Sequence, residues 1–155
     1  MLIWTAIAAT GTALAAVYSG VQLQRSRLEP MRRATIEQLS ILDERMRPML
    51  FHSPAAQRET IIRCYRAECD MTEEAAKYLS FLNALDLAAF AAKHGLIDAK
   101  MFAEHARTLT TAEMVPLSFL VELQKCCDDP FIYEHLRGFL QEEAATVRHR
   151  KPLAS

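Results

Sequence analysis

Hydrophobic residues divide the chain into one long apolar stretch and several shorter stretches with apolar positions at helical spacing. Residues 2–24 contain no Asp, Glu, Lys, Arg or His, and their polar members are mainly threonines and two glutamines. A helix of this length reaches roughly 34 Å, which exceeds a hydrocarbon core of about 30 Å. Hydroxyl side chains bond back to their own helix and cost little in lipid. The pattern therefore predicts a transmembrane helix over residues 2–24, with Trp4 at the membrane interface.

Positive charge beside this stretch predicts its orientation. Four arginines follow the stretch and none precedes it; they are Arg25, Arg27, Arg32 and Arg33. Loops rich in Lys and Arg stay in the cytoplasm, so we expect the N-terminus outside and the C-terminal domain in the cytoplasm of a bacterial cell inner membrane. Residues 25–33 then form a basic juxtamembrane segment, in which each arginine gains about 1 kcal/mol near anionic lipid. Membrane lipids are thus an expected partner.

The predicted span has two unlike faces. At 100° per residue, small side chains fall on one stripe, formed by Thr5, Ala9, Ala13, Ala16 and Gly20. Small residues let helix backbones approach closely, which is how helices associate in lipid. The stripe predicts packing against other transmembrane helices, as a homo- or hetero-oligomer. An alanine-rich composition alone is the alternative explanation of the stripe.

Two other interpretations of the apolar stretch remain. Ala13-Leu14-Ala15 resembles the small-x-small site at which signal peptides are cleaved. A signal peptide begins with a basic segment, however, and no Lys or Arg precedes this stretch. The stretch is also able to form a buried helix of a soluble core, but nothing downstream looks large enough to enclose it.

The rest of the chain predicts an all-α fold. Glycine occurs only four times, while Ala, Leu, Glu, Arg and Met are frequent. Apolar residues recur every three or four positions. They predict helices over residues 31–47, 58–69, 73–93 and 130–147, and a helical pattern that starts at Asp98, runs through Leu109 and continues over residues 117–127. We expect a small cytoplasmic bundle of about four to six helices over residues 34–147, followed by a basic tail over residues 148–155.

Capping signals mark the helix over residues 73–93 most clearly. Residues 70–74 supply N-cap candidates and two first-turn acids. Gly95 suits the left-handed position after the helix, and Leu96 suits the hydrophobic contact that accompanies it. This helix is apolar over much of its circumference, so we expect it at the centre of the bundle.

Prolines mark other boundaries. Pro30 disfavours helix at the preceding residue and is expected to close the juxtamembrane segment. Asp129 and Pro130 are a start signal for the last helix, as N-cap and first helical residue. Pro116 either kinks its helix or restarts it after a break, and the sequence does not distinguish these outcomes.

Two segments, QLQRSRLEPMRRATIEQL and FLNALDLAAFAAKHGLIDAKMF, are similar to segments of a known protein family. With the N-terminal span and the terminal amphipathic helix, the chain resembles an uncharacterised family of small bacterial single-pass membrane-anchored helical proteins, a domain of unknown function. The resemblance covers most of the chain and implies a cytoplasmic helical bundle on a single-pass anchor. It implies no activity, cofactor or site residue.

Cysteine spacing argues against a metal centre. Structural zinc sites present pairs of cysteines two to four residues apart, whereas Cys64 and Cys69 are five positions apart and Cys126 and Cys127 are adjacent. On a continuous helix, Cys64 and Cys69 would lie about 140° apart. We expect partly buried free thiols, since disulfides would require an oxidising compartment.

No other motif indicates catalysis. The five histidines show no metal-ligand spacing, and the chain lacks a nucleophile elbow, a phosphate-binding loop and a dinucleotide-binding turn. The net charge of −1 gives no electrostatic case for nucleic acid. We expect no catalytic residue, no cofactor, no metal and no nucleic-acid partner, so the protein is not expected to be an enzyme.

Asn83 and Asp86 are a polar pair on an otherwise apolar helix, three residues apart on one side. Buried polar groups must find partners. The pair is therefore expected to make an interhelical bond to an Arg or a hydroxyl, or to form a docking or ligand contact.

These observations favour a non-catalytic single-pass membrane protein that is an accessory, scaffolding or regulatory subunit of a larger complex. A first alternative is a membrane-tethered cytoplasmic sensor or effector that binds a small ligand or a soluble protein. A second alternative is an exported, disulfide-bonded helical domain after signal cleavage.

Overall fold

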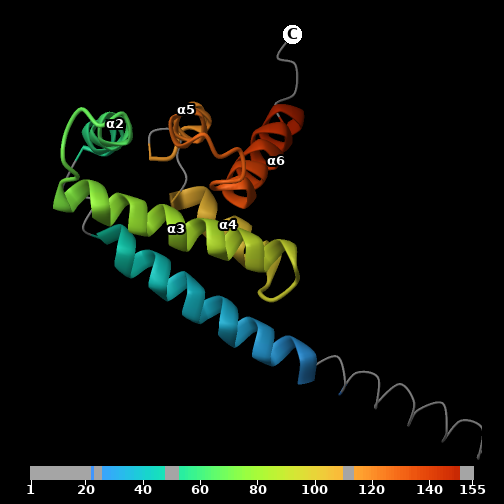
Figure 1. The fold of residues 1–155 in the computed structure, drawn as a ribbon. Coiled ribbons are helices and arrows are strands. Elements are labelled where there is room, and N and C mark those ends of the chain that lie inside the picture. The colour runs from blue at the N-terminus through green and yellow to red at the C-terminus, as the bar shows by residue number, and fades with distance from the viewer. Residues whose placement is uncertain (1–21, 23–25, 48–52, 110–113, 151–155) are drawn as a thin grey trace, which may run out of the picture.

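The computed structural model describes residues 22, 26–47, 53–109 and 114–150 (Figure 1). These residues form helices joined by turns, and no strand is found among them, which confirms the all-α prediction. The predicted transmembrane segment, residues 2–24, lies outside the described residues except for Gln22. Within the described ranges, every helix is too short or too polar to cross a lipid bilayer.

The central element is α3 (Glu73–Lys93), as its wide apolar surface predicts. The N-terminal helix (residues 26–46) lies along one side of α3, and α2 (Pro54–Tyr65), α5 (Leu117–Cys127) and α6 (Glu134–Arg150) lie on the other side (Figure 1). Helix α4 (Ala99–Leu109) packs beside α3. All of these helices contribute to one core, with fully buried Leu42, Ile61, Tyr78, Phe81, Phe102, Leu120 and Leu136.

The N-terminal helix continues through Pro30, so the prediction that Pro30 closes a separate juxtamembrane segment is wrong. Proline removes one backbone hydrogen bond, and its ring needs space next to the preceding turn. Pro30 is exposed, while Thr35 and Leu42 of the same helix are fully buried and hold it against the bundle. Residues 26–33 are therefore helical and continuous with the part of the helix that packs against the bundle.

Both ends of α3 follow the predicted capping signals. The Thr72 hydroxyl accepts a hydrogen bond from the backbone N–H of Ala75 at 3.2 Å. Gly95 has a φ of +68°, and the N–H of the next residue, Leu96, bonds back into the last turn of the helix. The predicted apolar contact of Leu96 is wrong, because its side chain is 60% exposed and Ile97 is buried in its place.

Pro116 separates two helices rather than kinking one. Helix α4 starts after Asp98, whose carboxylate accepts bonds from the N–H groups of Lys100 and Met101 at 3.0 and 3.1 Å. It ends at Leu109, and α5 begins after Pro116, whose extended backbone (ψ 137°) cannot continue a helix.

The last helix begins later than predicted. Asp129 and Pro130 belong to a turn, and α6 starts at Glu134, directly after Tyr133 with a positive φ of 55°. The helix extends to Arg150, so residues 148–150 of the predicted basic tail are helical. Hydrogen bonds that link side chains of α3 and α5 to the turn and to the first residues of α6 explain this late start.

Candidate functional site

The predicted polar pair of α3 faces the beginning of α6. The Asn83 Oδ1 accepts a hydrogen bond of 2.7 Å from the Tyr133 hydroxyl. The Asp86 Oδ1 accepts one of 2.7 Å from the backbone N–H of Leu136. Asn83 therefore makes the predicted bond to a hydroxyl outside its own helix. A docking contact through Asn83 and Asp86 stays a prediction.

Asp86 caps α6 from a neighbouring helix. Leu136 is the third residue of α6, and its N–H is among the first donors of a helix, which have no acceptor within it. Tyr133, directly before the helix, has no short side-chain acceptor for these donors. A carboxylate near the positive end of the helix dipole is also favoured electrostatically. Burial raises the pKa of Asp86 above its ordinary value of 3.8, and the hydrogen bond from Leu136 offsets part of that increase.

Gln124 of α5 fixes the turn before α6. Its side chain is buried, and its Nε2 donates to the backbone oxygens of Pro130 at 3.1 Å and Ile132 at 2.7 Å. Its Oε1 accepts a bond of 2.7 Å from Arg137 of α6. The amide thus links α5, the turn and α6. The sequence holds no signal for this role, because a single glutamine in an amphipathic helix is typical of an exposed position.

Two histidines that are far apart in the sequence meet beside this turn. The ring centroids of His94 and His135 lie 6.4 Å apart, and that of Phe90 lies 5.0 Å from that of His135. The Nδ1 of His135 is buried and has no hydrogen-bond partner among the described residues. Within the same ranges, no group of three or more His, Cys, Asp or Glu side chains is placed to hold a metal ion. The structure shows a cluster of rings here, in which the Phe90 ring contacts the rings of both histidines.

A hollow of about 240 Å³ lies next to this cluster, between α3, α4 and α6. Its lining combines buried Ala89 and Phe102 with exposed Lys93, Glu134 and Glu142. Sites for drug-sized ligands have volumes of about 300 Å³ or more. The hollow therefore suits a smaller molecule with a positive or amphipathic character.

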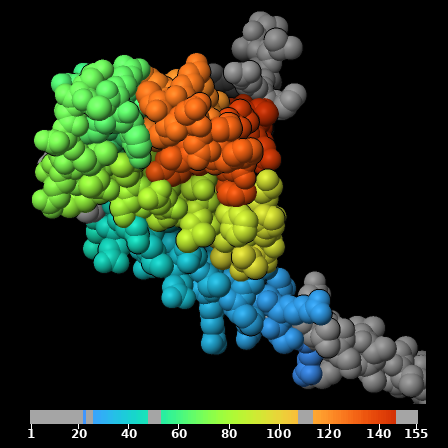
Figure 2. All heavy atoms as spheres, in the orientation of Figure 1, coloured from blue at the N-terminus to red at the C-terminus, as the bar shows by residue number. Residues whose placement is uncertain are grey.

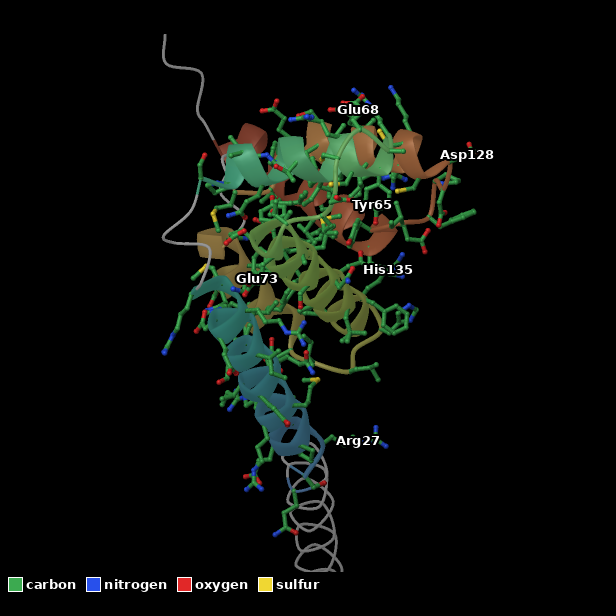
Figure 3. All side chains as sticks on the ribbon, turned by 60° about the vertical axis from the view of Figure 1, so that its left-hand side comes forward. Arg27, Tyr65, Glu68, Glu73, Asp128 and His135 are labelled. Carbon is green, nitrogen blue, oxygen red and sulfur yellow. The ribbon has the colours of Figure 1, made fainter. Side chains whose placement is uncertain are left out.

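The N-terminal helix carries the described members of the basic group. Arg27, Arg32 and Arg33 are exposed, and Figure 3 places Arg27 at the opposite end of the molecule from Glu68 and Asp128. The space-filling view shows this end of the helix extending beyond the body that the other helices form (Figure 2). Seven further predicted membrane residues lie outside the described residues: Trp4, Arg25 and the whole small stripe of Thr5, Ala9, Ala13, Ala16 and Gly20.

Buried Thr35 fastens the N-terminal helix to the start of α4. Its hydroxyl accepts a bond of 2.8 Å from the backbone N–H of Asp98 and donates one of 2.7 Å to the backbone oxygen of Met31. Both hydrogen-bonding capacities of this hydroxyl are used, so a fully buried polar side chain is satisfied.

Two charged residues near the other end of this helix add further links. Asp43 lies 2.9 Å from the Nε2 of His105 in α4. The Arg45 guanidinium donates to the hydroxyl of Ser80 in α3 at 2.6 Å and to its backbone oxygen at 3.1 Å. With Thr35, these contacts hold the helix at several points against α3 and α4. They define its direction relative to the bundle.

The cysteines are free thiols, but two of them lie closer together than expected. The Sγ atoms of Cys64 and Cys69 are 3.1 Å apart. The predicted separation of about 140° is wrong, because it requires one helix through both residues. Helix α2 instead ends at Tyr65, and the chain turns back.

Comparison of the chain with protein-family models, with curated proteins and with solved structures found no match. The resemblance to small bacterial membrane-anchored proteins therefore stays a prediction.

Proposed function

We propose that the chain is a non-catalytic, single-pass membrane protein whose cytoplasmic bundle is an accessory, scaffolding or regulatory subunit of a larger complex in a bacterial inner membrane. In this proposal residues 2–24 form the anchor. The small stripe packs against other transmembrane helices, and Trp4 with the arginines contacts the lipid interface.

The observation that carries the proposal is the attachment of the N-terminal helix to the bundle. The described part of this helix runs from residue 26, the position after Arg25, to residue 46. Thr35, Asp43 and Arg45 link it to α3 and α4. In this proposal the helix continues into the anchor, which would hold the bundle at a defined orientation to the membrane, whereas a flexible linker would only keep it nearby. A defined orientation suits a subunit of an assembly.

The surface that remains for a partner lies on the side of α3 away from the N-terminal helix. A shallow groove follows α5 and is lined by Val121, Glu122 and Lys125 together with Arg66 of α2. Arg66 and Glu122 form an ion pair of 2.9 Å across it, and Val121 is 36% exposed. The mixture of charge and exposed apolar area is typical of the rim of a protein interface.

Membrane insertion is tested with the full chain and two matched variants. We expect the wild type in the membrane fraction after a high-salt wash, and a cytoplasmic reporter fused after Ser155 to be active. A13R places a guanidinium in the middle of the span at a cost of about 2.5–3.5 kcal/mol and should reduce insertion. A13L should insert normally. Wild-type protein in the soluble fraction, or a reporter active only in the periplasm, would contradict the anchor.

The subunit role needs a separate experiment. Purification of the native protein in mild detergent should recover a stoichiometric protein partner or a defined homo-oligomer. A13L, which enlarges the small stripe, should weaken that association, while L14I on the opposite face should leave it unchanged. A lone monomer would exclude the subunit role. The mass of the mature chain also tests the exported alternative, which requires loss of the first residues.

The hollow between α3, α4 and α6 favours the tethered sensor as a second candidate. Its volume of about 240 Å³ and its lining, in which glutamates outnumber lysine, suit a small positively charged or amphipathic molecule. Ala103 lines the hollow, so A103F should fill it and abolish any ligand-dependent rise in melting temperature. A ligand effect that persists in A103F would place the ligand elsewhere.

A further inference from the structure

The thiols of Cys64 and Cys69 form a close pair at the end of α2. Their Sγ atoms are 3.1 Å apart, which is nearer than unbonded sulfur atoms usually approach. Both side chains are half-buried. The Cys69 thiol also lies 3.7 Å from the backbone oxygen of Thr60 in the preceding turn of α2. Cys69 is therefore folded back over the helix that carries Cys64.

A left-handed turn brings the two sulfurs together. Ala67 has a φ of +59°, and its N–H bonds to the backbone oxygen of Cys64 at 2.9 Å. The N–H of Glu68 bonds to the backbone oxygen of Arg63 at 2.9 Å. These two bonds form the reversal that commonly ends helices, at a position where glycine is preferred. The chain thus adopts an unfavourable alanine conformation at the residue that directs Cys69 toward Cys64.

The other two cysteines differ in their surroundings. Cys126 and Cys127 are neighbours within α5, where successive side chains point about 100° apart. Burial raises the pKa of the Cys127 thiol. Among the described cysteines, the sulfur–sulfur contact is thus specific to Cys64 and Cys69.

We propose that Cys64 and Cys69 are a reversible oxidation site that reacts with low-molecular-weight disulfides such as glutathione disulfide. In the first step, one cysteine thiolate attacks a sulfur of glutathione disulfide, which gives a protein–glutathione mixed disulfide and releases one glutathione thiolate. In the second step, the other cysteine attacks the protein sulfur, closes the Cys64–Cys69 bond and releases the second glutathione. The two cysteine sulfurs are oxidised, glutathione disulfide is reduced, and the two released thiolates take up the two cysteine protons.

Burial, with the hydrogen bond to Cys69 as a second cause, raises the pKa of the Cys64 thiol. The thiolate is the attacking form in both steps, so the reaction should quicken as the pH rises. Because the two sulfurs are in contact, whichever cysteine forms the mixed disulfide has the other in place to close the bond.

The bond would connect the end of α2 to the segment that leads into α3. Arg66, between the two cysteines, forms the ion pair with Glu122 across the groove along α5. Oxidation therefore stiffens one wall of that groove. An effect on a protein partner rests on the proposed function, whereas formation of the bond does not.

The test uses the purified full chain in detergent, incubated with glutathione disulfide and then labelled with a maleimide. Trypsin cuts after Arg66, between the two cysteines, so their peptides stay together only when a disulfide joins them. We expect two of the four thiols to be lost, the Cys64 and Cys69 peptides to be joined, and dithiothreitol to restore all four. Labelling of all four thiols after oxidation, or a bond that involves Cys126 or Cys127, would overturn the proposal.

Variants test the geometry. C126S/C127S should oxidise like the wild type. C64S and C69S should each stop at the mixed disulfide, on the one cysteine of the pair that remains. A67G should close the bond at least as fast as the wild type, while A67V should close it several-fold more slowly, with circular dichroism as the check on folding. Equal closure in A67V and A67G, both folded, would also overturn the proposal.

Discussion

Helices α3 and α6 pack against each other, yet they begin in different ways. The first turn of α3 is capped by Thr72, which directly precedes the helix. The first turn of α6 is capped by Asp86, which lies 50 positions earlier in the chain and belongs to α3. One helix start is thus encoded next to the helix, and the other is supplied by packing. Substitutions at the two starts should therefore differ in size and in how far their effects spread.

The largest effect is expected from Q124A. The substitution leaves two backbone oxygens of the turn and the Arg137 guanidinium without their buried partner. Loss of such bonds with unsatisfied partners left behind costs about 2–4 kcal/mol in the free energy of unfolding. Urea denaturation measures this value. Q141A, at an exposed position of α6, should stay within about 0.5 kcal/mol of the wild type.

The second-largest effect is expected from removal of Asp86, the residue of α3 that caps α6. D86A removes the acceptor for the N–H of Leu136, and we expect a loss of about 1–2 kcal/mol. Hydrogen exchange should quicken most in the first turn of α6, far from residue 86 in the sequence. Faster exchange confined to α3 would mean that Asp86 does not cap α6.

The charge of Asp86 predicts a pH dependence. Its pKa in the folded chain is raised above the ordinary value of 3.8, so the folded state binds this proton more tightly than the unfolded state. The contribution of Asp86 to stability is therefore greatest below pH 3.8 and is lost as the pH rises through the folded pKa. D86N keeps an oxygen acceptor but no charge. Relative to the wild type, D86N should become more stable as the pH rises from 3.8, measured by thermal unfolding; a pH-independent difference would contradict this.

Local signals of α3 should give a smaller and more confined effect. T72A removes the side-chain acceptor for the N–H of Ala75 and should lower the free energy of unfolding by about 1 kcal/mol. T72S keeps a hydroxyl and should retain most of the stability that the cap contributes. G95A should cost about 1 kcal/mol through the backbone alone, because nothing lies within 4 Å of an added Cβ. Thermal unfolding measures both variants. A much larger loss in G95A would indicate a steric clash that the structure lacks.

The smallest effect is a gain. A67G relieves the left-handed alanine at the end of α2, where φ is +59°, and should stabilise the reduced protein by about 0.5–1 kcal/mol. Glycine also makes the unfolded chain more flexible, which limits the gain. Melting temperatures of the reduced proteins measure it. A67G less stable than the wild type would show that the turn is not strained.

Signals at helix ends succeeded where the capping group and the capped group are close in sequence. Thr72, Gly95 and Asp98 lie within three residues of the backbone groups that they cap or reverse. Asp129 and Pro130 carry an equally strong start signal, yet α6 begins four residues after Pro130. Gln124 of α5 and Asn83 of α3 form hydrogen bonds with the intervening turn, and Asp86 of α3 accepts one from the first turn of α6. The groups that determine this helix start therefore lie on other helices.

The candidate sites also differ in whether their residues are close together in the sequence. The sequence indicated the basic group of arginines and the polar pair of α3, because both are runs of residue types at short spacing. It did not indicate the Cys64–Cys69 contact, since that contact depends on Ala67 adopting a left-handed conformation. It also did not indicate the bond between Thr35 and Asp98, whose residues are 63 positions apart.

The all-α class, the central position of α3 and the ends of α3 follow from the order of residues, because hydrophobic periodicity and capping act over three or four positions. Helix α2 (Pro54–Tyr65), by contrast, begins and ends four residues before the predicted range of 58–69. The continuity of the N-terminal helix through Pro30, the late start of α6 and the pairing of two thiols required the packed chain. Each depends on groups that become neighbours when helices bury their apolar faces together, and spacing along the chain carries no record of those distances.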